Sequence, residues 1–269
     1  MPQNGLLLSP NNSKAAVYDK DAINYFSRAG VTNATAKSQI NAFVKGVKNL
    51  GLYNSMICWP LRSAQNAGTG TTAYSLGGIG IYNATLTNGP TWGTNEISLD
   101  GVNDSFSAVL PELQTNTIIC VGNYVTAVNG ILFSLQKQGL VYNTINRFCQ
   151  QAYDFNGFNG FYSNPTTFTF ATIATSVGLT RSFFGAGYKS TGFQVFNRNS
   201  VSSASFTLPA LPVDRLLLAA RQDNSGNPEV FAKSAFSFCL VLSSEISMAQ
   251  RDSIYSLYKT TLGQGLGLP

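Results

Sequence analysis

The segment LDGVND carries three oxygen-bearing side chains, Asp100, Asn103 and Asp104, within five positions. Such a group could bind a cation, supply an acid pair for catalysis, or hold a turn. A calcium ion takes about six to eight oxygen ligands, and no second acidic cluster in the sequence completes that shell. Asp and Asn bond their own backbone and Gly accepts positive φ, which suits a tight hairpin. We therefore expect a hairpin turn here, with calcium binding as the weaker alternative.

Other residues that could perform catalysis are scattered. The chain contains no histidine, so neither a Ser-His-Asp triad nor a Cys-His pair can form. The glutamates Glu96, Glu112, Glu229 and Glu245 are isolated from one another, whereas retaining glycoside hydrolysis needs two carboxyl groups about 5 Å apart. The glycine-rich run GTGTTAYSLGGIG lacks the lysine of a phosphate-binding loop and reads as a surface connection. We expect a protein without catalytic residues or a cofactor.

The four cysteines, Cys58, Cys120, Cys149 and Cys239, lie far apart and form no CxxC pair. Without histidine this spacing does not indicate a zinc site. Cys120 and Cys239 sit inside apolar runs, where a buried thiol is the usual occupant. We expect four free thiols.

Aromatic residues alternate with amides in the segment QQAYDFNGFNGFYSNPTTF. Aromatic rings can stack on sugar rings while amide and carboxylate groups bond the hydroxyls. The alternative is a pair of strands whose aromatic side chains fill a core. If sugar binding is real, we expect it to involve Tyr153, Asp154, Phe155, Asn156, Phe158, Asn159 and Tyr162.

Composition favours a mainly β protein. The chain has 269 residues, of which 44% are hydrophobic and only 11% charged, with many Tyr, Phe and Gly. The net charge of +5 is spread along the chain, so we do not expect nucleic-acid binding. The N-terminal MPQNGLLLSPNNSK has neither a basic start nor a long apolar run, and no window predicts a spanning helix. We expect a soluble protein made in a cytoplasm, without membrane insertion.

Two amphipathic helices are predicted before the strands. Asp19 can cap the first, which ends near Gly30, and the second carries an apolar stripe closed by Gly51. This stripe could pack on the edge of a sheet or dock on a neighbouring subunit, and we favour the second. The stripe consists of Ile40, Phe43, Val44, Val47 and Leu50.

The remaining chain predicts a two-sheet antiparallel sandwich. Between Glu96 and Leu242 a dozen short apolar runs are separated by Gly, Asn or Pro. The preceding stretch, 64–93, predicts loops and short edge strands. After the last run, Ser247 and Gln250 form a capping box before a C-terminal helix that ends at Gly263.

The order of these pieces resembles the concanavalin A-like lectin/glucanase superfamily in its laminin-G-like jelly-roll form. The resemblance rests on EISLDGVNDSF, TNTIICVG and FAKSAFSFCLVLSSEISMAQRDSIYSLYK. The helical lead-in, DAINYFSRAG to INAFVKGVKNLGLYNSMICWPL, is similar to that found before such domains in structural proteins of tailed bacteriophages. Glucanases of the superfamily carry an E-x-D-x-E-like run, which this chain lacks.

These observations predict a helical module over residues 1–55 and a jelly-roll sandwich with a C-terminal helix over 56–269. The function we expect is a non-enzymatic virion structural protein of a tailed bacteriophage, displayed on the particle surface as a tail or fibre component or a capsid decoration. Its expected partners are other virion proteins and further copies of itself. The alternative is a carbohydrate-binding module for attachment to host surface glycans.

Overall fold

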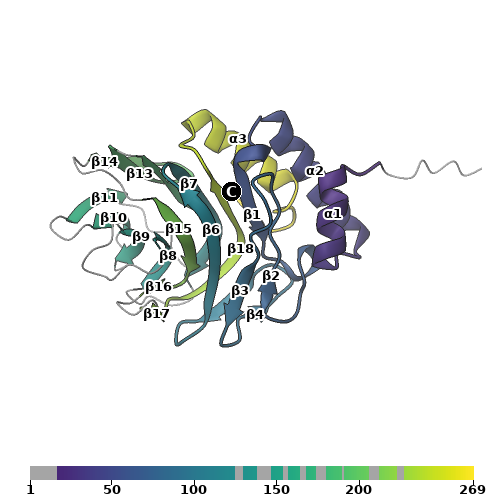
Figure 1. Cartoon of the computed structure of the whole chain (residues 1–269), viewed down its shortest axis with the longest axis horizontal. Coiled ribbons are helices and arrows are strands. Elements are labelled where there is room, and N and C mark those ends of the chain that lie inside the picture. Colours follow the sequence, from purple (N-terminus) through teal and green to yellow (C-terminus); the bar gives the residue numbers. More distant parts are fainter. Residues whose placement is uncertain are drawn as a thin grey trace, which may run out of the picture.

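The architecture is that of a computed structural model, which describes residues 17–124, 130–137, 147–153, 157–163, 168–173, 180–189, 191–205, 212–222 and 227–269. Two antiparallel sheets are stacked face to face, and helices cover one of them (Figure 1). The predicted fold class, a mainly β two-sheet sandwich with helices at both ends, is confirmed.

The first sheet, sheet A, has β7 and β18 at its centre, joined by antiparallel pairing. β1 (Met56–Pro60), which the sequence did not predict as a strand, pairs with β18 beyond the main path of the sheet. The strands of that path are, in order, β14 (Val201–Ser205), β13 (Gly192–Asn197), β12 (Ser182–Lys189), β7 (Asn116–Tyr124), β18 (Lys233–Leu242), β5 (Ile97–Asp100) and β4 (Thr91–Trp92).

The second sheet, sheet B, is also antiparallel throughout, and the predicted short edge strands lie at one side of it. A separate two-stranded ribbon joins β16 (Arg221–Gln222) to β17 (Pro228–Glu229). The predicted run at 139–144 lies outside the described residues. The strands of sheet B are, in order, β11 (Phe168–Ile173), β10 (Gly157–Ser163), β9 (Arg147–Tyr153), β8 (Gly130–Gln136), β15 (Val213–Leu218), β6 (Ser105–Leu113), β3 (Ala84–Thr87) and β2 (Thr72–Ala73).

The helices α1 (Lys20–Ala29), α2 (Ala34–Asn49) and α3 (Met248–Thr260) begin and end where the sequence predicts, within a few residues. The Asp19 side chain accepts a hydrogen bond from the Asp21 amide at the start of α1. Gly30 and Gly51 are left-handed, with φ of 64° and 71°. Ser247 and Gln250 form the predicted capping box of α3. Short 3₁₀ turns, Tyr53–Ser55 and Ser63–Gln65, flank β1.

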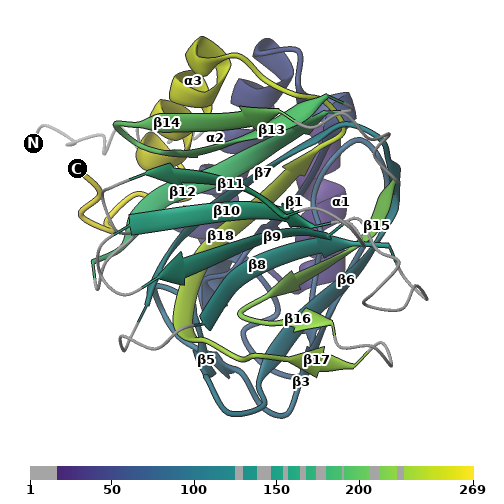
Figure 2. The same ribbon diagram turned by 90° about the vertical axis from the view of Figure 1, so that its left-hand side faces the viewer.

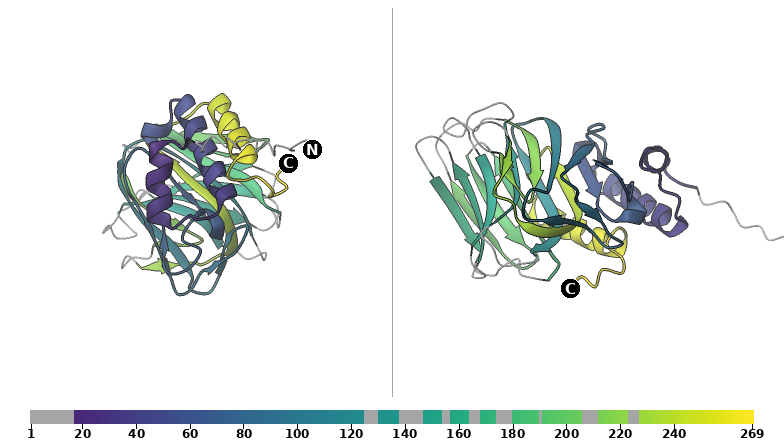
Figure 3. Two further views of the ribbon diagram at one scale, coloured as in Figure 1. Left: turned by 90° about the vertical axis from the view of Figure 1, so that its right-hand side faces the viewer. Right: turned by 90° about the horizontal axis from the view of Figure 1, so that it is seen from below.

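All three helices lie on the outer face of sheet A, so the molecule has three layers (Figure 3). The apolar stripe of α2 is buried there, with Phe43 fully covered and its ring 5.6 Å from the ring of Phe238 in β18. The preference for docking on a neighbouring subunit was therefore wrong, because the stripe packs within the chain, on the face of a sheet. Phe238 also contacts Tyr258 of α3, at 4.6 Å between ring centroids.

Two hydrophobic cores result, one between the sheets and one between sheet A and the helices. The helix-side core joins Phe43 to Phe238, so it spans the predicted division at residue 55. That division stays a prediction. Within the described residues, no helix is long and apolar enough to cross a membrane.

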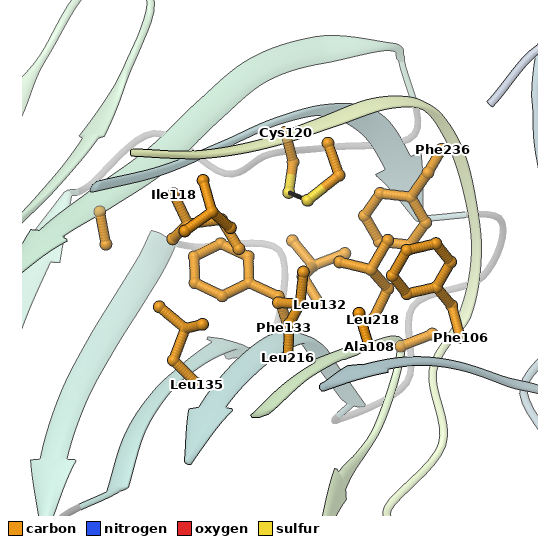
Figure 4. Packing of buried hydrophobic residues seen from close by; sticks show 14 of the residues in the cluster. Phe106, Ala108, Ile118, Cys120, Leu132, Phe133, Leu135, Leu216, Leu218 and Phe236 are labelled. Carbon is orange, nitrogen blue, oxygen red and sulfur yellow. Dashed lines mark hydrogen bonds between the residues drawn. The ribbon is translucent and has the colours of Figure 1, made fainter. Parts of the chain in front are cut away.

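Three cysteines, Cys58, Cys120 and Cys239, are buried free thiols, as predicted. Cys120 lies among the apolar side chains between the sheets (Figure 4). The fourth, Cys149, belongs to β9, where the structure describes the backbone alone.

Candidate functional site

The turn at LDGVND joins the two sheets. It connects β5, which pairs with β18 in sheet A, to β6, which pairs with β15 and β3 in sheet B. The predicted hairpin is therefore wrong, although the turn itself is present. Turn chemistry is local, but the strand partners are set by residues far away in the chain.

The acids of this turn are occupied by its own backbone. One carboxylate oxygen of Asp100 accepts from the amides of Val102, Asn103 and Asp104 at 2.8, 3.2 and 3.2 Å. These bonds, led by that from Val102, lower the pKa of Asp100. Asp104 is 5% exposed and accepts from the Asp100 amide at 3.1 Å, and its burial raises its pKa. Gly101, with φ of 77°, completes the turn.

This geometry bears on the calcium alternative. Asp100 and Asp104 bring two carboxylates together, but no third acidic, histidine or cysteine side chain of the described residues joins them in a metal-binding group. A cation would compete with three amide hydrogens for the Asp100 oxygen. The site residues Asp100, Asn103 and Asp104 thus act in the turn, and calcium binding stays an untested hypothesis.

Each isolated glutamate has a cationic partner. These pairs hold separate parts of the fold together. Lys137, the partner of Glu112, also pairs with Asp214 at 3.0 Å and so binds two carboxylates at once. The pairs are Glu96 with Arg181, Glu112 with Lys137, Glu229 with Arg221 at 2.8 Å, and Glu245 with Lys189 at 3.4 Å.

The predicted aromatic segment forms the hairpin of β9 and β10, which confirms it as a strand pair. Tyr153, Phe158, Asn159 and Tyr162 lie in these two strands, whereas Asp154, Phe155 and Asn156 lie outside the described residues.

The register divides the predicted residues between two faces, because residues directly opposite each other share a face of a sheet. The position of Phe158 is opposite Ile173, and Ile173 is buried in the core between the sheets. The position of Asn159 is opposite exposed Thr172. The sequence-based prediction placed these residues on one surface, but the two-residue period of a strand puts them on two faces of the sheet. Their role in sugar binding stays a prediction.

The outer face of sheet B has no helical layer and faces the viewer in Figure 2. Polar side chains of its central strands form two hydrogen-bonded pairs, which together we call the polar row: Ser107 of β6 with Arg215 of β15, and Ser134 with Gln136, both of β8. The Nε of Arg215 donates to Ser107 at 3.2 Å. The amide of Gln136 donates to Ser134, which donates to the carbonyl of Ala220, both at 3.1 Å.

Accessibility differs along the polar row. Ser134 and Gln136 are fully buried, and Oε1 of Gln136 accepts no hydrogen bond from the described residues. Ser107 and Arg215 are partly exposed, and Val109, opposite Arg215, is 55% exposed. Burial lowers the pKa of Arg215, which still remains a cation at neutral pH. The row therefore combines a partly exposed cation with a buried amide oxygen that accepts no hydrogen bond from the part of the chain that the structure describes.

The ribbon of β16 and β17 lies beside β8 and β15, two of the strands that carry the polar row (Figure 2). Its two ends carry unusual backbone: Ala219 and Val230 adopt φ of 58° and 54°, a region that costs L-residues about 1–2 kcal/mol. Val230 is β-branched, which makes this conformation rarer still. Strain of this kind concentrates at functional sites. Val230 packs against Ile131 of β8, whereas Ala219 belongs to the core between the sheets, so only Val230 places this strain on the outer side of sheet B.

The polar row was not predicted from the sequence. Polar and apolar residues alternate in SFSAVL and LFSLQ, and this pattern indicates strands with one buried face. That pattern does not reveal that β6, β15 and β8 are neighbours, and so it could not bring Ser107, Arg215 and Gln136 together.

A concave surface lies among the helices, with a volume of about 380 Å³. Lys48 lines it, paired with Asp19 at 2.7 Å and Asp21 at 2.6 Å, and its ammonium lies 4.8 Å from the ring centroid of Tyr53. Burial acts to lower the pKa of Lys48, but the two carboxylates together outweigh it, so the pKa is raised. These charges already satisfy one another, so this surface is the weaker candidate.

Comparison with known proteins identifies the fold. No family model matches the sequence, and no curated protein matches it. Among solved structures, a Trypanosoma rangeli sialidase in complex with the inhibitor DANA aligns with a TM-score of 0.57 and 9% identity, over 85% of this chain and 39% of that one. The ligand binding domain of botulinum neurotoxin serotype D, in complex with N-acetylneuraminic acid, aligns with a TM-score of 0.56 and 9% identity, over 78% of this chain and 52% of that one.

These structural alignments establish a shared lectin-like β-sandwich fold, and at 9% identity they establish nothing finer. The chain spans about two fifths of the sialidase and about half of the neurotoxin domain. The two-sheet β-sandwich that the concanavalin A-like resemblance implies is confirmed.

Proposed function

We propose that the protein is a carbohydrate-binding module whose ligand lies on the outer face of sheet B. The observation that carries this proposal is the polar row, because Ser107 and Arg215 present a partly exposed hydroxyl and a partly exposed guanidinium on the outer face of sheet B, which no helix of the described residues covers. Sugar hydroxyls both donate and accept hydrogen bonds, so they match such a mixture. This was the alternative in our sequence analysis, and the geometry favours it over a purely structural role.

Two further observations support the proposal. The fold is shared with a neurotoxin domain solved with N-acetylneuraminic acid and with a sialidase solved with an inhibitor. The positions of Tyr153 and Asn159 lie in the row of β9 and β10 that continues the outer face, since Gln151 and Cys149 of that row pair with Ile131 and Ser134 of β8.

We also propose that the module performs no bond-breaking chemistry. Its glutamates are held in ion pairs with lysine or arginine, and the chain has no histidine. Incubation with a panel of polysaccharides should release no new reducing ends. Release of reducing ends that depends on one of these glutamates would contradict this part.

A glycan array tests the binding site. The native protein should bind at least one class of glycan, and Arg215→Ala should weaken that binding by about tenfold or more, as loss of a charge-assisted hydrogen bond predicts. Arg198→Ala removes the same charge from the helical side, where Arg198 lies over Tyr255, and should leave binding unchanged.

Two outcomes would contradict the proposal. Binding of no glycan above background would remove the function. Binding that survives Arg215→Ala and Tyr153→Ala, with both variants folded, would remove the site. Phe158→Ala is a useful third variant, because its position belongs to the row that contains buried Ile173 and should affect stability more than binding.

A structural protein on the virion surface of a tailed bacteriophage is the second candidate. The sequence resemblance of the helical lead-in favours it, and such a protein could also bind host glycans. Its partners would be other virion proteins and further copies of the chain. Purified protein that stays monomeric and never co-sediments with particles would refute it.

A further inference from the structure

Cys120 and Cys239 face each other across the centre of sheet A. They are direct register partners on β7 and β18, and the Cys120 thiol donates to the Cys239 sulfur at 3.8 Å (Figure 4). Both side chains are 0% exposed and belong to the core between the sheets. A disulfide bond is about 2.05 Å long, so the two sulfurs need to approach by less than 2 Å, roughly, to reach bonding distance.

We propose that Cys120 and Cys239 form a disulfide when the chain folds in the presence of a thiol–disulfide oxidant. With oxidised glutathione, one protein thiolate attacks the glutathione disulfide and releases one reduced glutathione. The second protein thiolate then attacks this mixed disulfide and releases the other. Two thiol protons and two electrons pass to glutathione, and one sulfur–sulfur bond forms in the protein.

Burial decides when this reaction can occur. The thiolate is the reacting form. Burial is the larger cause that raises the pKa of Cys239, and the neighbouring Cys120 is the smaller one. An oxidant also cannot reach either sulfur in the folded protein. The bond should therefore form during folding, while β7 and β18 are pairing and still open to solvent, and only very slowly afterwards.

Cys58 provides an internal control. It lies on β1, next to β18, but its side chain belongs to the core on the helix side of sheet A. Its register partner on β18 is Leu240, so it faces away from the Cys120 and Cys239 pair. Proximity in the sheet therefore does not make Cys58 a partner for either sulfur.

The test is to refold the full chain with a glutathione redox buffer and, separately, with a reductant. Peptide mapping by mass spectrometry should find a cross-link between Cys120 and Cys239 in the first sample alone. Because this bond would close a loop with 119 residues of sequence separation, it should raise Tm by roughly 5 °C or more. Cys58→Ala should keep the cross-link, and Cys120→Ala or Cys239→Ala should lose it.

Three results would overturn the proposal: four free thiols after oxidative refolding, a cross-link that involves Cys58 or Cys149, or a cross-linked form that melts below the reduced protein. A lower melting temperature of the cross-linked form would show that the bond forms in misfolded chains. Mapping on the native sequence needs no variant, so the test survives if a cysteine variant fails to fold. The proposal does not depend on glycan binding.

Discussion

The two outer faces of the sandwich differ in what covers them. On sheet A, β18 is buried at nine of its ten positions, because the core lies on one side and the helices lie on the other. On sheet B, β6 alternates between buried and partly exposed residues. Figures 2 and 3 show these faces from opposite directions. One face is closed by apolar contacts, and the other presents hydrogen-bonding groups.

This difference teaches how the molecule divides its tasks. A face sealed by Phe43, Phe238 and Tyr258 contributes stability and is inaccessible to a ligand. The outer face of sheet B keeps polar side chains and, at Val230, strained backbone, and strain of this kind is typical of functional surfaces. Substitutions on the two faces should therefore separate stability from binding.

The largest effect should come from Phe43→Ala on the closed face. Phe43 is fully buried against Phe238, so its loss leaves a cavity and should lower the free energy of unfolding by about 3–5 kcal/mol. Val109→Ala, at a 55% exposed position on the open face, should change it by less than about 0.5 kcal/mol. Urea denaturation measures both, and similar losses would show that the two faces do not differ in this way.

A smaller effect of opposite sign should appear at the base of the β16–β17 ribbon. Ala219 has positive φ, so Ala219→Gly should raise the free energy of unfolding by about 0.5 kcal/mol, the relief of strain less the entropy cost of glycine. Ala232, whose amide donates to Ala219, has no positive φ. Ala232→Gly should therefore lower the free energy of unfolding by about 1 kcal/mol. A loss of stability at both positions would show that Ala219 is not strained.

An effect of comparably small size should appear at the turn that joins the two sheets. Asp100→Asn weakens three bonds to backbone amides, and because Asp100 is exposed we expect a loss of only about 0.5–1 kcal/mol at pH 7. The pKa of Asp100 is lowered in the fold, so its contribution is fully present above the ordinary value of 3.8 and disappears as the pH falls below that value toward the folded-state pKa.

The free energies of unfolding of the native protein and of Asp100→Asn should therefore differ at pH 7 and approach each other near pH 3. Unfolding curves at the two pH values measure this. Asp104→Asn is the matched control, since burial already penalises the charge of Asp104 and the amide oxygen can still accept from Asp100. It should cost less than Asp100→Asn. A difference that does not depend on pH would remove the carboxylate charge as the cause.

Much of the fold could be predicted from local patterns, but less of the site could. The caps at Asp19 and Ser247, the left-handed Gly51 and the strands around Cys120 and Cys239 each depend on neighbouring residues. The polar row depends on β6, β15 and β8 being adjacent, although Ser107 and Arg215 are 108 residues apart in sequence. No local pattern encodes such a contact.

The sequence by itself therefore determined where the helices begin and end, that Asp100 starts a turn, and that histidine-dependent catalysis is absent. Only the tertiary structure decided that this turn joins two sheets, that the α2 stripe is covered by sheet A, and that Phe158 and Asn159 occupy positions on opposite faces. The physical reason is range: caps and turns are closed by hydrogen bonds over a few residues, whereas strand neighbours and covered faces follow from packing between distant segments.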